Sequence, residues 1–145
     1  MLLADESQLD DLTRKLMRIG LDNIMGFVPS TEAYTDQGGQ LDTVPVIDVE
    51  SFKSILEEPN VQVVDLRNAT EFKSGHVKGA DHVFVGTLMG NLEKVSKNKK
   101  VVIHCQSGDR ATIGYSLLAK AGYTNVLNYS ASMNEWMALG NPVVF

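Results

Sequence analysis

The fold of this chain is decided by the stretch Val101-Val-Ile-His-Cys105-Gln-Ser-Gly-Asp-Arg110-Ala-Thr-Ile-Gly114. Val101–Cys105 is an apolar run rich in β-branched residues, which predicts a buried strand. A helix is expected over Asp109–Ala121, closed by Gly122. Its buried face is expected to carry Ile113, Leu117 and Leu118. A cysteine is therefore expected at the carboxyl end of a strand, just before a helix begins.

The same alternation of strand and helix extends through the rest of this region. Further strands are expected at Val46–Ile47, Val61–Asp65 and Asn125–Asn128, and further helices at Val49–Glu58 and Leu88–Lys97. Strands separated by helices favour a mainly parallel sheet that is covered on both faces. The sequence therefore predicts an α/β fold, in which ligand sites lie at the carboxyl ends of the strands.

The composition is that of a globular protein and argues against several functions. The chain has 145 residues and a net charge of −5, so we expect it to bind neither nucleic acid nor an anionic membrane. Its single cysteine excludes an internal disulfide framework and a multi-thiolate metal cage. No apolar run reaches the roughly 20 residues of a membrane span. No secretory leader is visible, and we expect a cytoplasmic protein.

The first 43 residues have a different pattern. Leu9–Ile19 has helical periodicity, Asn23–Val28 predicts a short strand, and Pro29–Thr43 predicts a polar, glycine-rich linker. We therefore divide the chain into an N-terminal extension at residues 1–43 and a domain at residues 44–145.

A weak internal repeat relates the extension to the domain. A shift of 102 residues places Arg18–Phe27 on Lys120–Tyr129 and Tyr34 on Trp136. One explanation is that a helix, a glycine and a strand follow one another in many α/β chains. The explanation we favour is that the extension is the end of a second domain of the same kind, whose front half is absent.

Cys105 has the sequence context of a reactive thiol. Successive N–H groups in the loop after it can converge on one point, and the helix N-terminus adds partial positive charge. Arg110 adds a permanent cation with a planar fork of donors. All of these favour the thiolate, which is the nucleophilic form, and can also bind an anionic substrate. The alternative is a buried, inert cysteine. We expect the substrate to be bound by Gln106, Ser107, Gly108, Asp109 and Arg110.

The length of the loop separates two kinds of cysteine chemistry. Four residues lie between Cys105 and Arg110, whereas cysteine-based phosphatases have five, which surround a tetrahedral phosphate. The shorter loop makes a smaller pocket, which suits a single transferred sulfur atom.

Three segments together resemble the rhodanese (sulfurtransferase) family. They are the loop Cys105–Arg110, the stretch Val64–Ala80 with its Asp-x-Arg, Glu-Phe and Gly-His patterns, and the tail from Gly122 to Val143. The resemblance implies a three-layer sandwich with a mainly parallel sheet of about five strands. It also implies a Cys105 persulfide that takes sulfane sulfur from thiosulfate or a low-molecular-weight persulfide and passes it to a thiol or cyanide. No metal or other cofactor is implied.

The chain departs from the family pattern in three places. Ala131 and Ser132 stand where the family usually has two glycines, and Asp81–Val85 replaces a run that usually leads to a proline. Asp109 places a carboxylate in the loop, where it either opposes binding of dianionic thiosulfate or caps the following helix.

The Val64–Ala80 stretch is expected to be mainly scaffold. Asp65 and Arg67 are assigned a supporting role, and the spacing allows Arg67 to pair with Glu71. The chain has three histidines without metal-ligand spacing, expected to be structural or to line the pocket edge: His76, His82 and His104.

Two other functions stay open on the sequence alone. The same thiol could serve a phosphatase or an arsenate reductase, or the domain could be a non-catalytic docking module, although such modules commonly lose the thiol. The segment from Ala4 to Phe27 is similar to a stretch of proteins that join a metallo-β-lactamase-fold persulfide dioxygenase to rhodanese domains. That similarity implies an upstream metal-binding module as a further partner.

Overall fold

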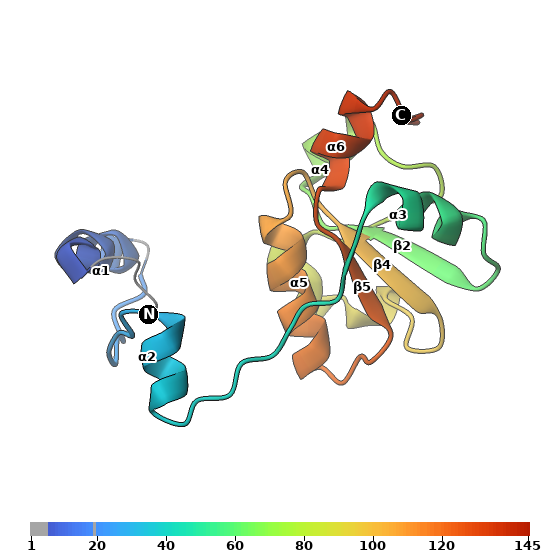
Figure 1. The fold of residues 1–145 in the computed structure, drawn as a ribbon. Helices are drawn as coiled ribbons and strands as arrows, with labels where there is room; N and C mark the ends of the chain where they lie inside the picture. Colours follow the sequence, from blue (N-terminus) through green and yellow to red (C-terminus); the bar gives the residue numbers. More distant parts are fainter. Residues whose placement is uncertain (1–5, 19) are drawn as a thin grey trace. The chain divides into compact units, whose positions relative to one another are not determined.

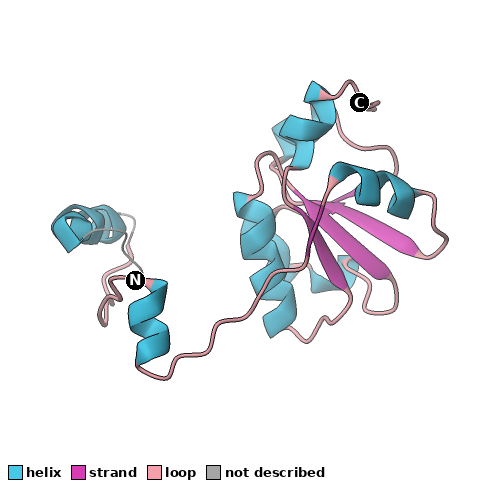
Figure 2. Cartoon of the chain, viewed as in Figure 1, coloured by secondary structure: helices cyan, strands magenta, loops and turns pink. Residues whose placement is uncertain are grey.

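The computed structural model describes residues 6–18 and 20–145. The chain divides into two compact units, Met1–Thr43 and Val44–Phe145, which are drawn as ribbons in Figure 1 and by secondary structure in Figure 2.

The larger unit is built on a five-stranded, wholly parallel sheet, which confirms the predicted α/β fold. Its strands are β1 (Val46–Ile47), β2 (Val61–Asp65), β3 (Asp81–His82), β4 (Lys100–His104) and β5 (Val126–Tyr129). They lie in the order β1-β5-β4-β2-β3, so β4 is the central strand. Strand β3 is the one strand that no expected range covered, because its two residues are too short to carry an alternating pattern.

Helices cover both faces of this sheet, as the ribbons in Figure 1 show. The helices are α3 (Val49–Leu56), α4 (Ala69–Lys73), α5 (Asp109–Lys120) and α6 (Ser132–Ala138). Side chains of β4 and of the residue that follows it alternate between two apolar clusters: Val101, Ile103 and Cys105 pack on the α5 side, and Val102 packs with α3 and α6. This alternation directs the Cys105 side chain toward helix α5.

The core on the α3 and α6 side is centred on aromatic rings. Phe52 stacks on Tyr129 with ring centroids 4.6 Å apart, and it meets Trp136 edge-on at 5.4 Å. All three side chains are buried. They pack α3 and α6 onto strand β5 of the sheet.

Two helix predictions in this unit need correction. The α-helix expected at Leu88–Lys97 is wrong, because the chain forms two short 3-10 helices, η2 (Val85–Gly90) and η3 (Leu92–Lys94). Glycine within and at the end of η2 disfavours a continuous α-helix. The Tyr123 hydroxyl also lies within hydrogen-bond distance of two backbone carbonyls of this segment.

The buried face of α5 includes Leu118, as predicted, and Leu117 is partly buried, but Ile113 is 54% exposed. The buried residues are Ala111, Gly114 and Leu118. A β-carbon at Gly114 would collide with the side chain of Leu66. The helix thus presents its smallest residue to the sheet, and Ile113 is turned toward solvent.

The N-terminal unit contains η1 (Glu6–Gln8), α1 (Leu9–Arg18) and α2 (Thr31–Asp36). The expected helix is confirmed up to Arg18, and Ile19 lies outside the described residues. The strand expected at Asn23–Val28 is wrong, since residues 21–27 are irregular. The expected linker at Pro29–Thr43 contains α2, which starts because Ser30 accepts a hydrogen bond from the N–H of Ala33 at 3.1 Å.

The 102-residue shift reproduces backbone geometry as well as sequence. Gly20 and Gly122 both have φ +83°. The N–H groups that follow them bond back five residues at 3.0 Å, from Leu21 to Leu16 and from Tyr123 to Leu118. Two further bonds match at the ends of α2 and α6, from Gly39 to Tyr34 at 3.0 Å and from Asn141 to Trp136 at 3.1 Å.

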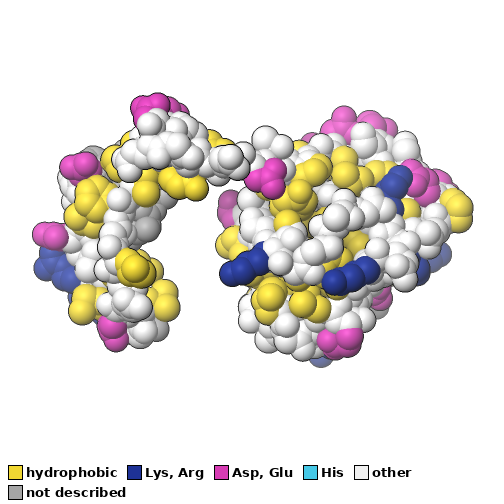
Figure 3. Space-filling model, turned by 90° about the horizontal axis from the view of Figure 1, so that it is seen from below, with side chains coloured by type: hydrophobic (Ala, Val, Ile, Leu, Met, Phe, Trp, Pro, Cys, Tyr) yellow, Lys and Arg dark blue, Asp and Glu magenta, His cyan; other side chains and the backbone are white. Residues whose placement is uncertain are grey.

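Side-chain burial, by contrast, differs between the two segments that the 102-residue shift relates. Leu118, Tyr129 and Trp136 are buried, whereas Phe27 is 38% and Tyr34 is 43% exposed, and none of the described α1 residues is buried. The N-terminal unit accordingly shows apolar side chains on its surface in the space-filling view of Figure 3.

Candidate active site

Cys105 lies at the carboxyl end of the central strand, directly after β4, and its side chain is buried. The chain then turns sharply and enters α5, with Gly108 as the residue before the helix. The N–H of Gly108 points back at the thiol and lies 3.1 Å from Cys105 Sγ. The loop therefore directs at least one backbone donor at the sulfur.

This turn depends on glycine at position 108. Gly108 has φ +105°, a conformation that side-chain-bearing residues rarely adopt. A β-carbon there would also collide with the carbonyl oxygen of Ser130. The β5–α6 turn thus limits the size of the loop residue whose N–H faces the sulfur.

The first turn of α6 holds the other half of the loop. The N–H of Met133 donates to the carbonyl of Cys105 at 3.2 Å, and the N–H of Asn134 donates to the carbonyl of Gln106 at 3.0 Å. The N–H of Cys105 in turn donates to Ser132 Oγ at 3.1 Å. The loop is therefore tied to α6 through its backbone.

Arg110 forms a bidentate ion pair with Glu71 of α4, with N–O distances of 2.6 and 2.7 Å. This hydrogen bond raises the pKa of Arg110 above its usual value, and nearby Cys105 adds to the effect. The same bond is the main cause of a lowered pKa at Glu71. A charge-assisted bidentate pair of this kind holds the guanidinium plane in one orientation beside the sulfur.

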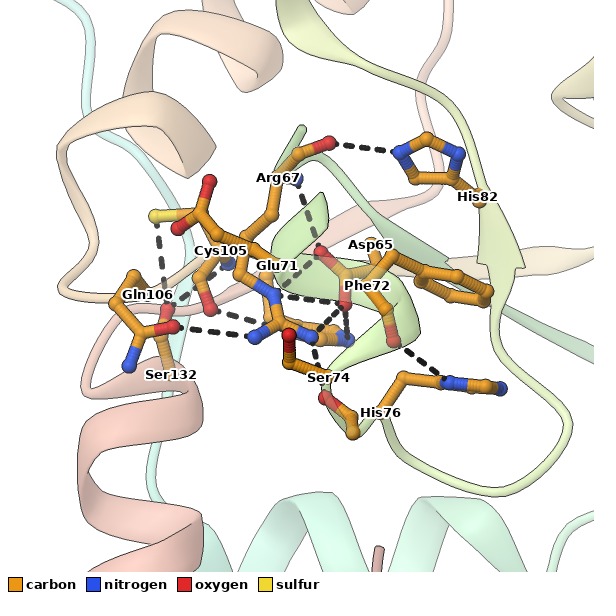
Figure 4. Close-up of polar contacts among 12 residues, drawn as sticks. Asp65, Arg67, Glu71, Phe72, Ser74, His76, His82, Cys105, Gln106 and Ser132 are labelled. Atoms are coloured by element: carbon orange, nitrogen blue, oxygen red, sulfur yellow. Dashed lines mark hydrogen bonds and ion pairs between the residues drawn. The ribbon is translucent and has the colours of Figure 1, made fainter. Parts of the chain in front are cut away.

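The pair that the spacing allows between Arg67 and Glu71 is not formed, because Glu71 binds Arg110. Arg67 turns inward instead and pairs with Asp65, through its Nε and Nη2 atoms and its backbone N–H, at 2.7 to 3.0 Å. Both side chains are almost fully buried. Arg67 Nη2 also donates to the carbonyl of Gly75 at 2.8 Å. Asp65 and Arg67 thus form a closed network behind the loop, as Figure 4 shows.

Gln106 connects this network to the loop. Arg67 Nη1 donates to Gln106 Oε1 at 3.1 Å, and Gln106 Nε2 donates to Asn134 Oδ1 at 2.6 Å. Both ends of the amide are therefore engaged by the scaffold. Of the expected substrate-binding residues, the Gly108 N–H faces the sulfur, and Arg110 is bound to Glu71 and close enough to Cys105 for the two charges to interact. The Gln106 side chain is held by Arg67 and Asn134.

Ser107 and Asp109 lie on the exposed part of the loop, with Ser107 Oγ donating to Asp109 Oδ2 at 3.3 Å. Asp109 does not cap α5, because it is the first helical residue and Gly108 holds the cap position. Its carboxylate instead lies in the first turn, where it interacts favourably with the helix dipole.

The three histidines take up positions around this network. His82 Nε2 bonds the carbonyl of Arg67 at 2.8 Å, and His76 Nδ1 bonds that of Phe72 at 3.0 Å. His104 is fully buried on the face opposite Cys105, and desolvation lowers its pKa. Across residues 6–18 and 20–145, no three His, Cys, Asp or Glu side chains come together as a metal site. Among those same residues, none of the helices is long and apolar enough to cross a membrane.

Comparisons with known proteins agree with this geometry. A family model described as a rhodanese-like domain matches residues 48–139. A sulfurtransferase of Allochromatium vinosum is 30% identical over 99 residues, covering 68% of this chain and 92% of that protein. The putative sulfur carrier protein YrkF of Bacillus subtilis is 25% identical over 95 residues, covering 65% of this chain but only 51% of its own length.

A solved structure matches the same region. The rhodanese-related protein of Thermoplasma volcanium superposes with a TM-score of 0.63 at 20% identity, covering 69% of this chain and 97% of that one. At this identity the match supports the fold alone. Together with the family model and the Allochromatium relative, it leads to one conclusion. The chain belongs to the rhodanese-like domain family.

Proposed function

We propose that this protein is a sulfurtransferase in which Cys105 carries the sulfur. The donor is thiosulfate or a low-molecular-weight persulfide, and the acceptor is a thiol or cyanide. The observation that supports this most directly is the Gly108 N–H, 3.1 Å from Cys105 Sγ at the carboxyl end of β4. Relatives named as sulfurtransferases point to the same chemistry.

The proposed reaction proceeds in two half-reactions. In the first, the Cys105 thiolate attacks the outer sulfur of thiosulfate, forming an S–S bond while sulfite leaves with the electron pair of the broken bond. In the second, a thiolate or cyanide attacks the outer sulfur of the persulfide. Cys105 then leaves as a thiolate, and the acceptor becomes a persulfide or thiocyanate. Two half-reactions of this kind give ping-pong kinetics.

The loop supplies donors where negative charge develops. The N–H groups of Asp109, Arg110 and Ala111 begin α5 and have no acceptor within that helix. They lie next to the Gly108 N–H and can stabilise an anionic donor or the persulfide. Glu71 offsets the charge of Arg110 and so lowers the net positive charge that the site presents to the thiosulfate dianion.

Access to the sulfur requires movement. Cys105 has no exposed surface, and the Arg110 and Glu71 side chains beside it are 29% and 27% exposed. A donor therefore reaches Sγ only when the loop or the Arg110 side chain shifts outward.

Intact-mass measurement tests the proposal. After incubation with thiosulfate or glutathione persulfide, the protein should gain the mass of one sulfur atom and lose it again on addition of cyanide. The variant Cys105→Ser is the control and should gain nothing. Absence of the added sulfur in the parent protein, or its presence in the variant, would refute the proposal. Hydrolysis of aryl phosphates without sulfur transfer would favour a phosphatase instead, and an inert Cys105 would favour a docking module.

We further propose that residues 1–43 are the end of a second, degenerate rhodanese-like unit within a longer cytoplasmic fusion. The matching backbone bonds at a shift of 102 residues support the first part. The similarity of the Ala4–Phe27 segment to metallo-β-lactamase-fold persulfide dioxygenase fusions supports the second. The coding sequence upstream tests it, since a metal-binding cluster of His and Asp codons is expected there and its absence would overturn the fusion.

A further inference from the structure

Ser132 occupies a backbone conformation that favours glycine. Its φ of +58° lies in the left-handed region, and among the described non-glycine residues it shares a positive φ only with Asn60. The residue is fully buried and is the first residue of α6, directly after the turn from β5. A side chain in this conformation is strained, so the serine must offer a compensating interaction that glycine lacks.

The hydroxyl of Ser132 supplies that interaction, and it does so at Cys105. Ser132 Oγ accepts the hydrogen bond of the Cys105 N–H at 3.1 Å. It has one proton to donate and two acceptors within range, the Tyr129 carbonyl at 2.9 Å and Cys105 Sγ at 3.9 Å. Figure 4 shows the hydroxyl lying against both the backbone and the sulfur of Cys105.

The two acceptors differ in how they respond to the charge of the sulfur. While Cys105 is a thiol, the carbonyl of Tyr129 is the nearer and stronger acceptor. When the sulfur is a thiolate, a hydrogen bond to it is charge-assisted and stronger. In a persulfide, the charge moves to the outer sulfur, and the inner sulfur next to Ser132 becomes a weak acceptor again.

We propose that Ser132 is a positioning residue that holds the Cys105 backbone and turns its hydroxyl proton to the sulfur when the thiolate forms. The role rests on the proposed sulfur transfer, because it favours the thiolate that attacks the donor and leaves when the acceptor takes the sulfur. The Gly108 N–H approaches the same sulfur from the loop. The sulfur anion therefore has one donor from each side of the site.

Alkylation of Cys105 by iodoacetamide tests this role without requiring any sulfur transfer. The full chain is compared with Ser132→Ala, which keeps the strained backbone and removes the hydroxyl, and with Ser132→Gly, which removes both. The control is Ser116→Ala, where another serine loses a hydroxyl bonded to a preceding carbonyl, at 3.2 Å, on the exposed part of α5. Alkylation is followed by intact mass across a pH series, and Tm is measured on the same samples.

Both Ser132 variants should react more slowly at neutral pH, by about ten- to a hundredfold, which is the loss expected for one hydrogen bond to a charged group. The pH at half-maximal rate should move upward in both, while Ser116→Ala keeps the parent value. A merely structural role predicts the opposite sign, since loosening the site exposes a buried thiol and speeds its alkylation.

Faster alkylation, or an unchanged pH midpoint, in Ser132→Gly would overturn the proposal. Ser132→Gly relieves the backbone strain, so its Tm is expected to exceed that of Ser132→Ala. The glycine variant therefore still gives a valid comparison with the parent if the alanine variant unfolds. If the parent protein takes up no sulfur, the proposed function fails, yet the shift in the alkylation midpoint still decides the role of Ser132.

Discussion

Replacing Gly108 by alanine places a methyl group where the structure has no room. The new β-carbon would meet the Ser130 carbonyl oxygen, which is backbone and cannot rotate away as a side chain could. The substitution also forces a side-chain-bearing residue to adopt φ +105°. Either the loop or the β5–α6 turn must move, and the Gly108 N–H moves with it, away from the sulfur.

The magnitude follows from a comparison with Gly122, which has φ +83° and no atom within 4 Å of the place that a β-carbon would take. Gly122→Ala therefore costs backbone strain alone, about 1–2 kcal/mol. Gly108→Ala adds the steric conflict to a similar strain, which brings the expected loss to about 3–5 kcal/mol. A domain near the middle of the ordinary range of about 5–15 kcal/mol still folds after such a loss.

Urea unfolding at neutral pH gives the two free energies of unfolding, and intact mass after incubation with a persulfide donor gives sulfur uptake at Cys105. We expect Gly122→Ala to lose a little stability and to take up sulfur normally. We expect Gly108→Ala to lose more stability and, although folded, to take up little sulfur. Equal stability and equal uptake in the two variants would refute the steric argument and the role of the Gly108 N–H.

Two further changes test the charged groups around the loop. Asp65→Asn should lower the free energy of unfolding by about 3–5 kcal/mol in urea, because Arg67 is left buried without its counter-charge; a loss below about 1 kcal/mol would show that the other partners of Arg67 suffice. Glu71→Gln should cost about 1 kcal/mol at neutral pH. Because the folded pKa of Glu71 lies below its ordinary 4.5, its ion pair stabilises the protein above pH 4.5, and this contribution disappears as the pH falls through the folded value. The Tm difference between parent and Glu71→Gln should therefore vanish at acid pH, and a difference that persists there would contradict the ion pair as its source.

The parallel sheet and the place of Cys105 could be predicted because their signals are local. An apolar run, a short polar loop and a helical pattern follow one another from Val101 to Ala121, and the strand direction then decides which end carries the loop. Local patterns failed where a tertiary contact overrode them. At Leu88–Lys97 the helical spacing was real, but glycines and the Tyr123 hydroxyl led to two 3-10 turns.

The partners of the loop could not be predicted, because they come from distant parts of the chain. Arg110 meets Glu71 across 39 residues of sequence, and Cys105 meets Ser132 across 27. The departure from glycine at Ser132 was visible in the sequence as an irregularity. Its left-handed backbone and its hydroxyl against Cys105 follow from the packing of α6 at the end of β4.

The sequence by itself determined which reactive groups are present. They are one thiol at the end of a strand and an arginine in the first turn of the helix that follows. These features depend on residues close together in the chain, so local physical rules suffice. Only the tertiary structure decided how that chemistry is controlled. It pairs Arg110 with Glu71, buries Asp65 with Arg67, and sets Gly108 and Ser132 on two sides of the sulfur. Ion pairs and hydrogen bonds select partners by position in space, and the sheet brings those positions together.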